Sequence, residues 1–493
     1  MATLAADLPP LADAPRVAET SLEAMAALLE RARAAFTTEL PVSAAVRKDR
    51  LTRAIALMID HADDWARAAS EDFGNRSREL TLISDVLAGA NALKHARKHV
   101  ERWMRPERRS PMFPLGLLGA SARVEYQPKG MVGIVAPWNF PIGLVMGPLA
   151  GVFAAGNRAI AKPSEFTPRV SEMFARLVPQ YFAEDEFAVV TGGPAVGEAF
   201  TKLPWDHLIF TGATSIGRHV ARAAADNLVP LTLELGGKSP VIVGQGANLG
   251  EVADRVAMGK MMNAGQICLA PDYVMIDAAR EGAFVEALGA SVKAMYPTLL
   301  ANDDYTSVVN DRHHARLTGL IDDARDKGAD VTVINPANED FASANSRKMP
   351  LHIVRGVTDD MKLMQEEIFG PVLPIRTTPS AGEAVAYVNA NPRPLGLYYF
   401  GPDRDEERRV LDTTISGGVT VNDVIFHVAQ EDLPFGGVGP SGMGAYHGID
   451  GFRTFSHAKS VYRQARVDVA KLAGLKPPFG KATAKTIARD LKK

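Results

Sequence analysis

The alternation of short apolar runs with helix-like segments is the feature that most constrains how this chain can fold. The apolar run Met131–Ala136 suits a buried parallel strand. A loop at Pro137–Pro141, a helix from about Ile142 to Ala155 and a second strand at Arg158–Lys162 follow it. Strand, helix and strand within about 30 residues make a βαβ unit. The alternation continues through Phe187–Thr191, Gly197–Leu203, His207–Thr211 and Ile216–Asn227. It therefore predicts an α/β fold with a doubly wound, Rossmann-like parallel sheet.

One stretch of this region imitates a membrane span. From Gly130 to Asn157 there are 28 residues without a charge, which is long enough to cross a bilayer. The stretch also holds three prolines, six glycines and two asparagines. A buried strand, loop and helix explain it better, so no integral membrane segment is expected.

Length and patterning predict further folding units. At roughly 150 residues per domain, the 493 residues suggest about three. A second alternating region from Glu251 to about Val421 predicts another α/β domain. The N-terminal part has helical periodicity, and Thr20 or Ser21 can cap one helix while Ser43 can cap the next.

Composition excludes several classes of protein. Apolar residues make 46% and charged residues 23% of the chain, and the net charge is −2. These values are typical of globular proteins and give no indication of nucleic-acid binding. Residues 1–15 carry no Lys or Arg and no long apolar core, so no secretory signal is expected.

Cysteine and histidine usage limits the chemistry. Cys268 is the only cysteine, which excludes an internal disulfide and a zinc site built from cysteines. None of the eleven histidines has metal-ligand spacing, so no metal is expected. A single thiol fits a reducing compartment, and we expect a cytoplasmic protein.

Two residues could carry chemistry on their own. Cys268 follows Gly265-Gln-Ile and is equally compatible with a nucleophile and with a small buried apolar residue. Glu234 ends an apolar strand before two glycines, where a buried carboxylate could act as a general base and an exposed one would be structurally neutral. The following Gly-Gly-Lys-Ser is not a phosphate loop, because Thr232 stands where the first glycine is required.

Other candidates follow predicted strands. Asn139 lies beyond the first strand, where its amide could stabilise an oxyanion or simply form a turn. Lys162 and Glu165 end the second strand and could hold hydroxyl or phosphate groups. Gly212 and Gly217 surround a helix start that could bind phosphate, although their spacing is not the dinucleotide fingerprint.

Taken together, these segments resemble the aldehyde dehydrogenase superfamily over about Ser21–Tyr462. Each matching motif is weak alone, and their order is specific. The motifs are Pro137-Trp-Asn-Phe-Pro141, Lys162-Pro-Ser-Glu165, Phe210-Thr-Gly212, Leu233-Glu-Leu-Gly-Gly-Lys238, Gly265-Gln-Ile-Cys268 and Glu366-Glu-Ile-Phe-Gly-Pro371.

Segments near the C-terminus resemble one branch of the superfamily. Cys268-Leu-Ala-Pro-Asp-Tyr273, Val421-Asn-Asp-Val424 and the glycine-rich run Pro434–Gly448 look like class 3, the fatty and aromatic aldehyde branch. Within it, Phe426–Leu433 looks most like bacterial coniferyl aldehyde dehydrogenases. The implied function is oxidation of an aromatic aldehyde, with coniferaldehyde favoured, to the acid. The alternatives are a medium- or long-chain fatty aldehyde dehydrogenase, an enzyme that acylates coenzyme A, and a binding protein without activity.

The resemblance assigns roles to the catalytic candidates. It implies that Cys268 attacks the aldehyde, that Asn139 and the Cys268 backbone N–H hold the oxyanion, and that Glu234 activates water to hydrolyse the thioester.

The resemblance also implies a nicotinamide cofactor, with NAD favoured and NADP as the alternative. Lys162 and Glu165 match positions that bind the adenosine ribose, and Glu367 and Phe369 match positions at the nicotinamide ribose and ring. Trp138 and Gly212 would line the path of the pyrophosphate, and Gly217, at the helix start, is a further cofactor-binding candidate. Ala213 departs from the family, which often has a hydroxyl or amide side chain there.

The family fold implies a division of the chain. The NAD-binding domain would comprise residues 16–117 and 136–235, and the catalytic domain 236–430. A small β-arm of 118–135 and 452–466 would join two subunits into a homodimer. Residues 467–493 form a basic tail: from Arg463 onward there are nine Lys or Arg and two Asp. We expect a solvated tail with one short helix, the alternative being weak attachment to an anionic membrane.

Overall fold

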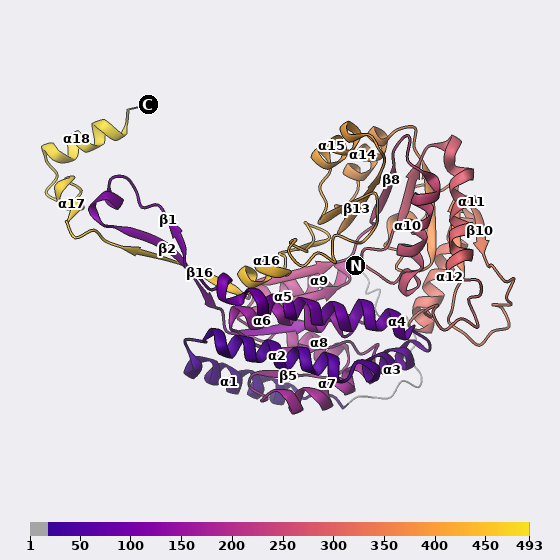
Figure 1. Cartoon of the computed structure of the whole chain (residues 1–493), viewed down its shortest axis with the longest axis horizontal. Coiled ribbons are helices and arrows are strands. Elements are labelled where there is room, and N and C mark those ends of the chain that lie inside the picture. Colours follow the sequence, from indigo (N-terminus) through magenta and orange to yellow (C-terminus); the bar gives the residue numbers. More distant parts are fainter. Residues whose placement is uncertain (1–17, 493) are drawn as a thin grey trace.

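The computed structural model describes residues 18–492, which contain three β-sheets. Two sheets are the cores of two α/β bodies that lie against each other, and the third belongs to an arm that projects away from them (Figure 1). The expected lack of a secretory signal concerns residues 1–15, which lie outside the described residues, as do the first two positions of the segment 16–117.

The first body has a six-stranded sheet at its centre. In sheet order, its strands are β15 (Gly442–Met443), β7 (Leu231–Leu235), β6 (His207–Gly212), β3 (Met131–Val135), β4 (Arg158–Lys162) and β5 (Phe187–Val189). All neighbours pair in parallel except β15, which is antiparallel to β7. The connecting helices are α6 (Gly143–Ala155), α7 (Pro168–Tyr181), α8 (Pro194–Thr201) and α9 (Thr214–Ala225). The predicted doubly wound parallel sheet is confirmed.

The strand order reverses in the middle of this sheet. From β3 the chain proceeds to β4 and β5 on one side, and then returns to β6 and β7 on the other. In open α/β sheets, ligands bind beyond the carboxyl ends of the strands at such a reversal. Asn139 follows β3 and Gly212 ends β6, so both lie at this position.

Helices from the N-terminal part pack beside this sheet (Figure 1). Their bounds are α1 (Leu22–Glu39), α2 (Ala44–Asp60), α3 (Ala62–Phe73), α4 (Arg78–Thr81), the π-turn η1 (Leu82–Leu87) and α5 (Ala88–Trp103). Ser21 caps α1 by accepting from the Ala24 N–H, and Ser43 caps α2 by accepting from the Val46 N–H.

The second body has a seven-stranded sheet. In sheet order, its strands are β10 (Asp330–Ile334), β11 (Leu351–Arg355), β12 (Val372–Thr377), β9 (Tyr273–Ile276), β8 (Pro240–Val243), β13 (Gly396–Phe400) and β14 (Gly418–Val421). Only the β10–β11 pair is antiparallel. The helices are α10 (Leu249–Met261), the 3-10 turn η3 (Met262–Gly265), α11 (Ala278–Met295), α12 (Asp311–Asp326), α13 (Lys362–Gln365), α14 (Ala381–Ala390) and α15 (Arg404–Thr413). The predicted second alternating region forms this body.

The arm differs in detail from the sequence expectation. Its sheet has the order β1 (Glu107–Arg109), β2 (Ser121–Pro128) and β16 (Ser456–Arg463), with the 3-10 turn η2 (Leu115–Leu118) between β1 and β2. The helix α16 (Gly448–Thr454) leads into β16. The expected arm segment 118–135 is too long, because β3 is buried in the six-stranded sheet between β4 and β6. The strand β1 was not expected in the arm.

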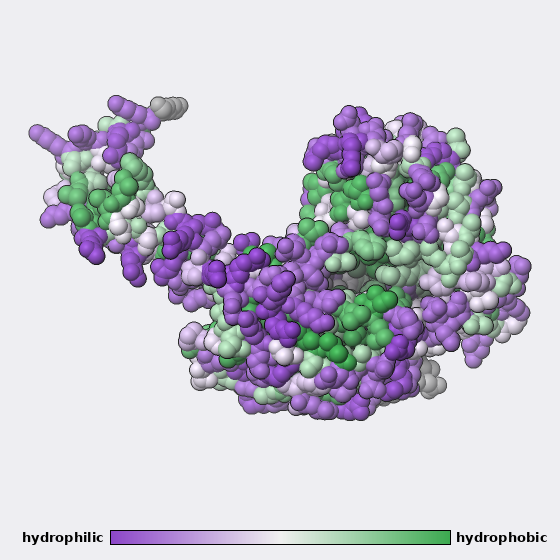
Figure 2. Space-filling view, in the orientation of Figure 1, coloured by the Kyte–Doolittle hydropathy of each residue, from purple (hydrophilic) through white to green (hydrophobic). Residues whose placement is uncertain are grey.

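The basic tail holds two helices rather than the one that was expected. They are α17 (Val469–Leu472) and α18 (Lys481–Asp490), and they lie at the outer end of the arm (Figure 1). Apolar surface gathers there (Figure 2), and Phe113, Leu472 and Phe479 are exposed.

The uncharged stretch 130–157 becomes β3, a loop and α6, as predicted. Ten of the thirteen residues of α6 are buried, which accounts for its apolar composition without a lipid environment. Among residues 18–492, no helix combines the length and the apolar character that a bilayer span requires.

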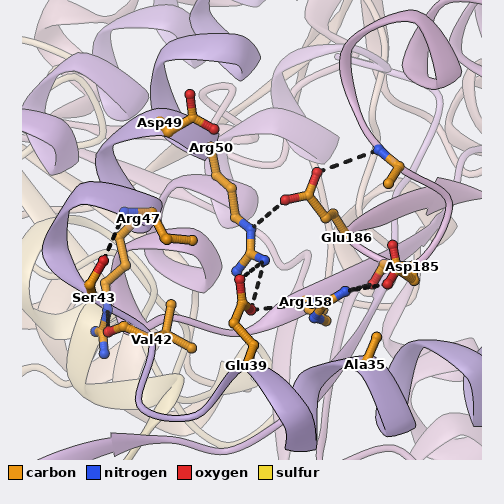
Figure 3. A network of polar contacts seen from close by, with 12 residues as sticks. Ala35, Glu39, Val42, Ser43, Arg47, Asp49, Arg50, Arg158, Asp185 and Glu186 are labelled. Carbon is orange, nitrogen blue, oxygen red and sulfur yellow. Dashed lines mark hydrogen bonds and ion pairs between the residues drawn. The ribbon is translucent and has the colours of Figure 1, made fainter.

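A buried ionic network attaches the N-terminal helices to the edge of the six-stranded sheet (Figure 3). The Arg50 side chain is fully buried; its Nη2 contacts Glu39 Oε1 at 2.7 Å and its Nε contacts Glu186 Oε1 at 3.1 Å. Arg158 of β4 contacts Glu39 Oε2 at 3.3 Å. The network therefore joins α1, α2, β4 and the loop before β5.

Replacing Arg50 should destabilise this body, because Glu39 and Glu186 would lose a buried partner. Breaking a buried pair costs about 3–5 kcal/mol, so we expect Arg50→Met to lower the midpoint of thermal unfolding clearly. Arg31→Met is the control, since Arg31 pairs with Glu184 on the surface and such pairs contribute about 0–1 kcal/mol. Equal shifts for the two variants would contradict the role of the network.

Candidate active site

Cys268 is positioned by a turn with an unusual backbone. Asn263 and Ala264 have φ of 51° and 52°, and Gly265 continues the left-handed run at 72°. A β-carbon on Gly265 would lie 2.4 Å from the carbonyl oxygen of Gly370, so only glycine fits. Left-handed non-glycine residues persist where the surroundings fix them, and they gather at functional sites. This turn ends three residues before Cys268.

The Cys268 side chain is partly exposed and faces two carboxyl groups. Burial of the sulfur, together with the negative charges of Glu367 and Glu234, raises the pKa of the thiol to about 12. The backbone N–H groups of Cys268 and Leu269 act in the opposite direction. The thiol is therefore protonated at neutral pH in this arrangement, and its activation requires a change in the charge around it.

The amide of Asn139 is anchored next to this turn. Its Nδ2 donates to the carbonyl oxygen of Gln266 at 3.1 Å, two residues before Cys268. The main-chain carbonyl oxygen of Asn139 accepts from Asn263 Nδ2 at 3.2 Å and from Arg76 Nη1 at 2.6 Å. Nδ2 carries a second hydrogen, which is available to an oxygen bound at Cys268. Asn139 and Cys268 come together although they belong to different bodies.

Glu234 is the last residue but one of β7, which ends at Leu235. The side chain is buried, and neither carboxylate oxygen has a hydrogen-bond partner. Desolvation raises the pKa of Glu234 well above its usual value. A carboxyl group with a raised pKa beside a thiol is suited to take and return a proton.

Glu367 and Phe369 lie beyond α13, on the loop that leads into β12. Glu367 is partly exposed, and its carboxylate lies against Gly236, where a β-carbon would clash with Oε2. Its Oε1 has no partner, and burial followed by the charge of Asp272 raises the pKa of Glu367 to about 8. Phe369 has a φ of 52° and packs at 5.3 Å, between ring centroids, from Trp138. Trp138 therefore lies beside Phe369, in an apolar cluster that includes Phe73 and Val309.

The residues beyond β4 and β6 form a second polar region. Lys162 Nζ contacts Glu165 Oε2 at 3.1 Å, and the lysine side chain is almost fully buried. Gly212 ends β6 before α9, whose cap residue Ala213 offers no side-chain hydrogen bond. The helix start consequently keeps N–H groups without a side-chain acceptor.

Gly217 has a packing role. A β-carbon at this position would lie 2.6 Å from the Leu235 side chain, so the glycine lets α9 approach β7 closely. Close helix–strand packing is also what the third glycine of dinucleotide folds provides, and the expected contact of Gly217 with the cofactor stays a prediction.

These features fit a dinucleotide. The orphaned Glu367 Oε1 can accept from ribose hydroxyls, and the start of α9 can accept negative charge. Glu165, 30% exposed in its side chain, can accept from a second ribose.

Several functional contacts had no signal in the sequence. Lys238 pairs with Asp272, whose Oδ1 accepts from the Ile368 N–H at 2.9 Å. Arg316 donates to the carbonyl oxygens of Glu367 and Ile368. Lys238 and Asp272 were visible only as members of motifs, and their pairing across 34 positions depends on the fold.

Comparisons with known proteins agree with this geometry. Residues 12–461 match the model of the aldehyde dehydrogenase family. The probable coniferyl aldehyde dehydrogenase of Caulobacter vibrioides is 55% identical over 467 residues, covering 94% of this chain and 96% of that protein. The coniferyl aldehyde dehydrogenase of a Pseudomonas species is 51% identical over 465 residues, covering 94% and 96%.

Among solved structures, the substrate-bound state of Staphylococcus aureus AldH superposes with a TM-score of 0.87 at 35% identity, covering 94% of this chain and 99% of that one. The chain therefore belongs to the aldehyde dehydrogenase family, and it oxidises an aldehyde with a nicotinamide cofactor.

Proposed function

We propose that this enzyme oxidises coniferaldehyde, or a closely related aromatic aldehyde, to the carboxylic acid with NAD. The observation that carries the chemistry is the convergence of a thiol, an anchored amide and an unpartnered buried carboxyl group at Cys268, Asn139 and Glu234. The substrate follows from similarity to two coniferyl aldehyde dehydrogenases over 94% of the chain.

The first step forms a bond between the Cys268 sulfur and the aldehyde carbon. The thiol proton leaves, and Glu234 and Glu367 are the nearby carboxyl groups that can accept it. The aldehyde oxygen becomes negatively charged, and the free N–H of Asn139 Nδ2 and the Cys268 backbone N–H stabilise it. Removing one such donor typically lowers kcat by roughly 10²–10³-fold.

A nicotinamide held by Glu367 and Phe369 would accept the hydride from the same carbon, and Cys268 would then carry a thioester. Glu234 then takes a proton from water as the water attacks the thioester carbon. The carboxylic acid leaves and the thiol is restored. A carboxyl group with a raised pKa suits this role, because it holds a proton strongly and returns it to the departing thiolate.

NAD is favoured over NADP by charge. The Glu165 carboxylate lies where the adenosine ribose is expected, so it would accept from ribose hydroxyls and repel a 2′-phosphate. Lys162 partly neutralises this carboxylate, which makes the preference a matter of degree.

We also propose a division of labour between the bodies. The six-stranded sheet binds the cofactor, the seven-stranded sheet carries the nucleophile, and the three-stranded arm joins two subunits into a homodimer. The exposed apolar side chains at the arm's outer end support the last point. A cytoplasmic location remains a prediction from composition.

Two competing enzymatic functions make different demands on the site. Transfer of the acyl group to coenzyme A has no need of a water-activating base, so the buried Glu234 favours hydrolysis. A fatty aldehyde dehydrogenase would use the same catalytic residues as an aromatic one. The two would differ only in the shape of the substrate-binding site. A binding protein without activity has no use for a base, a nucleophile and an oxyanion donor at one point.

Variants of the two central residues should separate the steps. Cys268→Ala removes the nucleophile and should abolish NADH formation. Glu234→Gln should leave one rapid turnover and slow the following ones by roughly 10²–10⁴-fold, because the thioester accumulates. Stopped-flow absorbance of NADH measures both. Undiminished turnover of Cys268→Ala, or rapid multiple turnovers of Glu234→Gln, would contradict the assigned roles.

A substrate panel tests specificity. We expect kcat/KM for coniferaldehyde and cinnamaldehyde to exceed that for hexanal and decanal, with NAD preferred over NADP. Benzaldehyde lacks the propenal chain of cinnamaldehyde, so the ratio of their kcat/KM values measures what that chain contributes. A clear preference for decanal would replace the aromatic substrate with a fatty one, and product formation that requires coenzyme A would replace hydrolysis with acyl transfer.

The raised pKa of the thiol has a direct consequence. Because Cys268 is the only cysteine, iodoacetamide labelling reports on it alone. With a thiol pKa of about 12, the labelling rate of the cofactor-free enzyme should rise continuously with pH, because the thiolate fraction rises. Cys268→Ser gives the background rate. A labelling rate that levels off about one to two pH units above 8.5, the pKa of an ordinary thiol, would contradict the shift.

A further inference from the structure

Arg76 and Asp85 form a fully buried ion pair beside the active-site loop. Arg76 Nη2 lies 3.1 Å from Asp85 Oδ2, and neither side chain has exposed surface. Arg76 precedes α4 and Asp85 lies in the π-turn η1, so the pair belongs to the N-terminal helices rather than to either sheet. The nucleophile, the base and the cofactor contacts do not include it.

Each member of the pair holds one end of the segment that carries Asn139. Arg76 Nη1 donates to the Asn139 carbonyl oxygen at 2.6 Å. Asp85 Oδ1 accepts from the N–H of Ile142 at 3.1 Å and from the N–H of Gly143. The loop between β3 and α6 is thereby held at Asn139 and again at Ile142 and Gly143.

Asp85 supplies the start of α6 with a cap that its own sequence lacks. Ile142, at the cap position, makes no side-chain hydrogen bond to the helix. The carboxylate of Asp85 accepts from two N–H groups there instead, 57 and 58 positions away in the chain. Gly143 permits this approach, because a β-carbon on it would lie 3.0 Å from Asp85 Oδ1.

The surroundings restrict how the pair can move. The Arg76 guanidinium lies 4.9 Å from the Phe73 ring centroid and 5.1 Å from that of Phe140. The π-turn that presents Asp85 leaves Ile83 and Leu87 exposed on its other side. Single π-turns recur at functional sites. A buried ion pair of this kind contributes little net stability, because desolvation of the two charges offsets their attraction.

We propose that Arg76 and Asp85 are positioning residues that hold the Asn139 amide at the oxyanion position beside Cys268, an inference that rests on the proposed role of Asn139. The pair acts on the reaction through Asn139 and has no contact of its own with the aldehyde. A small displacement of a group that acts in the transition state is enough to cost about 10²-fold in rate.

The test is a double-mutant cycle in the full-length enzyme. Asp85→Asn and Arg76→Lys are each made alone and together with Asn139→Ala, and kcat/KM is measured with cinnamaldehyde and NAD. We expect each single change to lower kcat/KM by about 10–100-fold, and Asn139→Ala to lower it by about 10²–10³-fold. In the double variants, adding Asp85→Asn or Arg76→Lys should lower kcat/KM no further than Asn139→Ala does alone. The reason is that the pair acts through the Asn139 side chain.

Iodoacetamide alkylation of Cys268 separates positioning from general damage. Alkylation needs the thiolate and develops no oxyanion, so its rate should be unchanged in Asp85→Asn and Arg76→Lys. Arg50→Lys is the matched control: Arg50 is equally buried and ion-paired but lies in the network away from this loop, and it should show no selective loss of kcat/KM. Arg76→Lys keeps a positive charge opposite Asp85, so it decides the question if Asp85→Asn does not fold.

The outcomes distinguish the role of Asn139 from that of the ion pair that positions it. Wild-type kcat/KM in Asn139→Ala would overturn the proposed role of Asn139 itself. A large loss in Asn139→Ala combined with full activity in Arg76→Lys, or with additive losses in the double variants, would overturn the positioning role alone. Parallel falls in alkylation and in kcat/KM would also overturn it, since they indicate a general disruption of the site.

Discussion

The contacts of Lys238 connect the parts of this active site. Only four residues separate β7, which carries Glu234, from β8, which begins the second sheet. Lys238 lies in this connection, and its ammonium group pairs with Asp272 and donates to the carbonyl oxygens of Leu363 and Glu366. Asp272 follows Cys268 by four positions and also accepts from the Ile368 N–H. One lysine therefore fixes the strand of the base, the loop of the nucleophile and the loop of Glu367 relative to one another.

Burial gives this site a common electrostatic character. Desolvation is the first cause of the raised pKa of Cys268, of Glu234 and of Glu367, and the negative charges of the two carboxylates reinforce the shift at the thiol. All three groups consequently favour their protonated, neutral forms. A cation bound among them would lower all three pKa values together.

Local patterns were sufficient to predict much of the fold. The strand Arg158–Lys162 has the predicted bounds, and the caps at Ser21 and Ser43 form as expected, because short apolar runs and serine caps depend on neighbouring residues. The extra strand β1 and one of the two tail helices were missed, since their sequences are polar or short. The arm bounds 118–135 were wrong because they took in β3, whose apolar run had itself predicted a buried parallel strand next to β4.

Site residues could be predicted where they stand in a sequence motif. They could not be predicted where only a tertiary contact connects them to the site. Cys268, Asn139 and Glu234 stand in recognisable motifs, although their roles remain proposals. Glycine at a helix start is typical of both phosphate binding and close packing. The proximity of Leu235 to Gly217 shows the packing, and the contact with the cofactor stays a prediction. Arg76 and Asp85 gave no signal, because their partners are main-chain groups whose positions follow from tertiary structure.

The pairing of β2 with β16 also orders the events of biosynthesis. Ser121 pairs with Arg463 and Pro128 with Ser456. The strand β2 is synthesised in the first third of the chain and therefore stays unpaired with β16 until the last part has been made. The edge of the six-stranded sheet behaves in the same way, because Gly442 pairs with Glu234. Since domains fold in the order in which they emerge from the ribosome, both α/β bodies can assemble before the arm exists. The general base thus receives its last neighbouring strand, and the arm its sheet, only when synthesis is nearly complete.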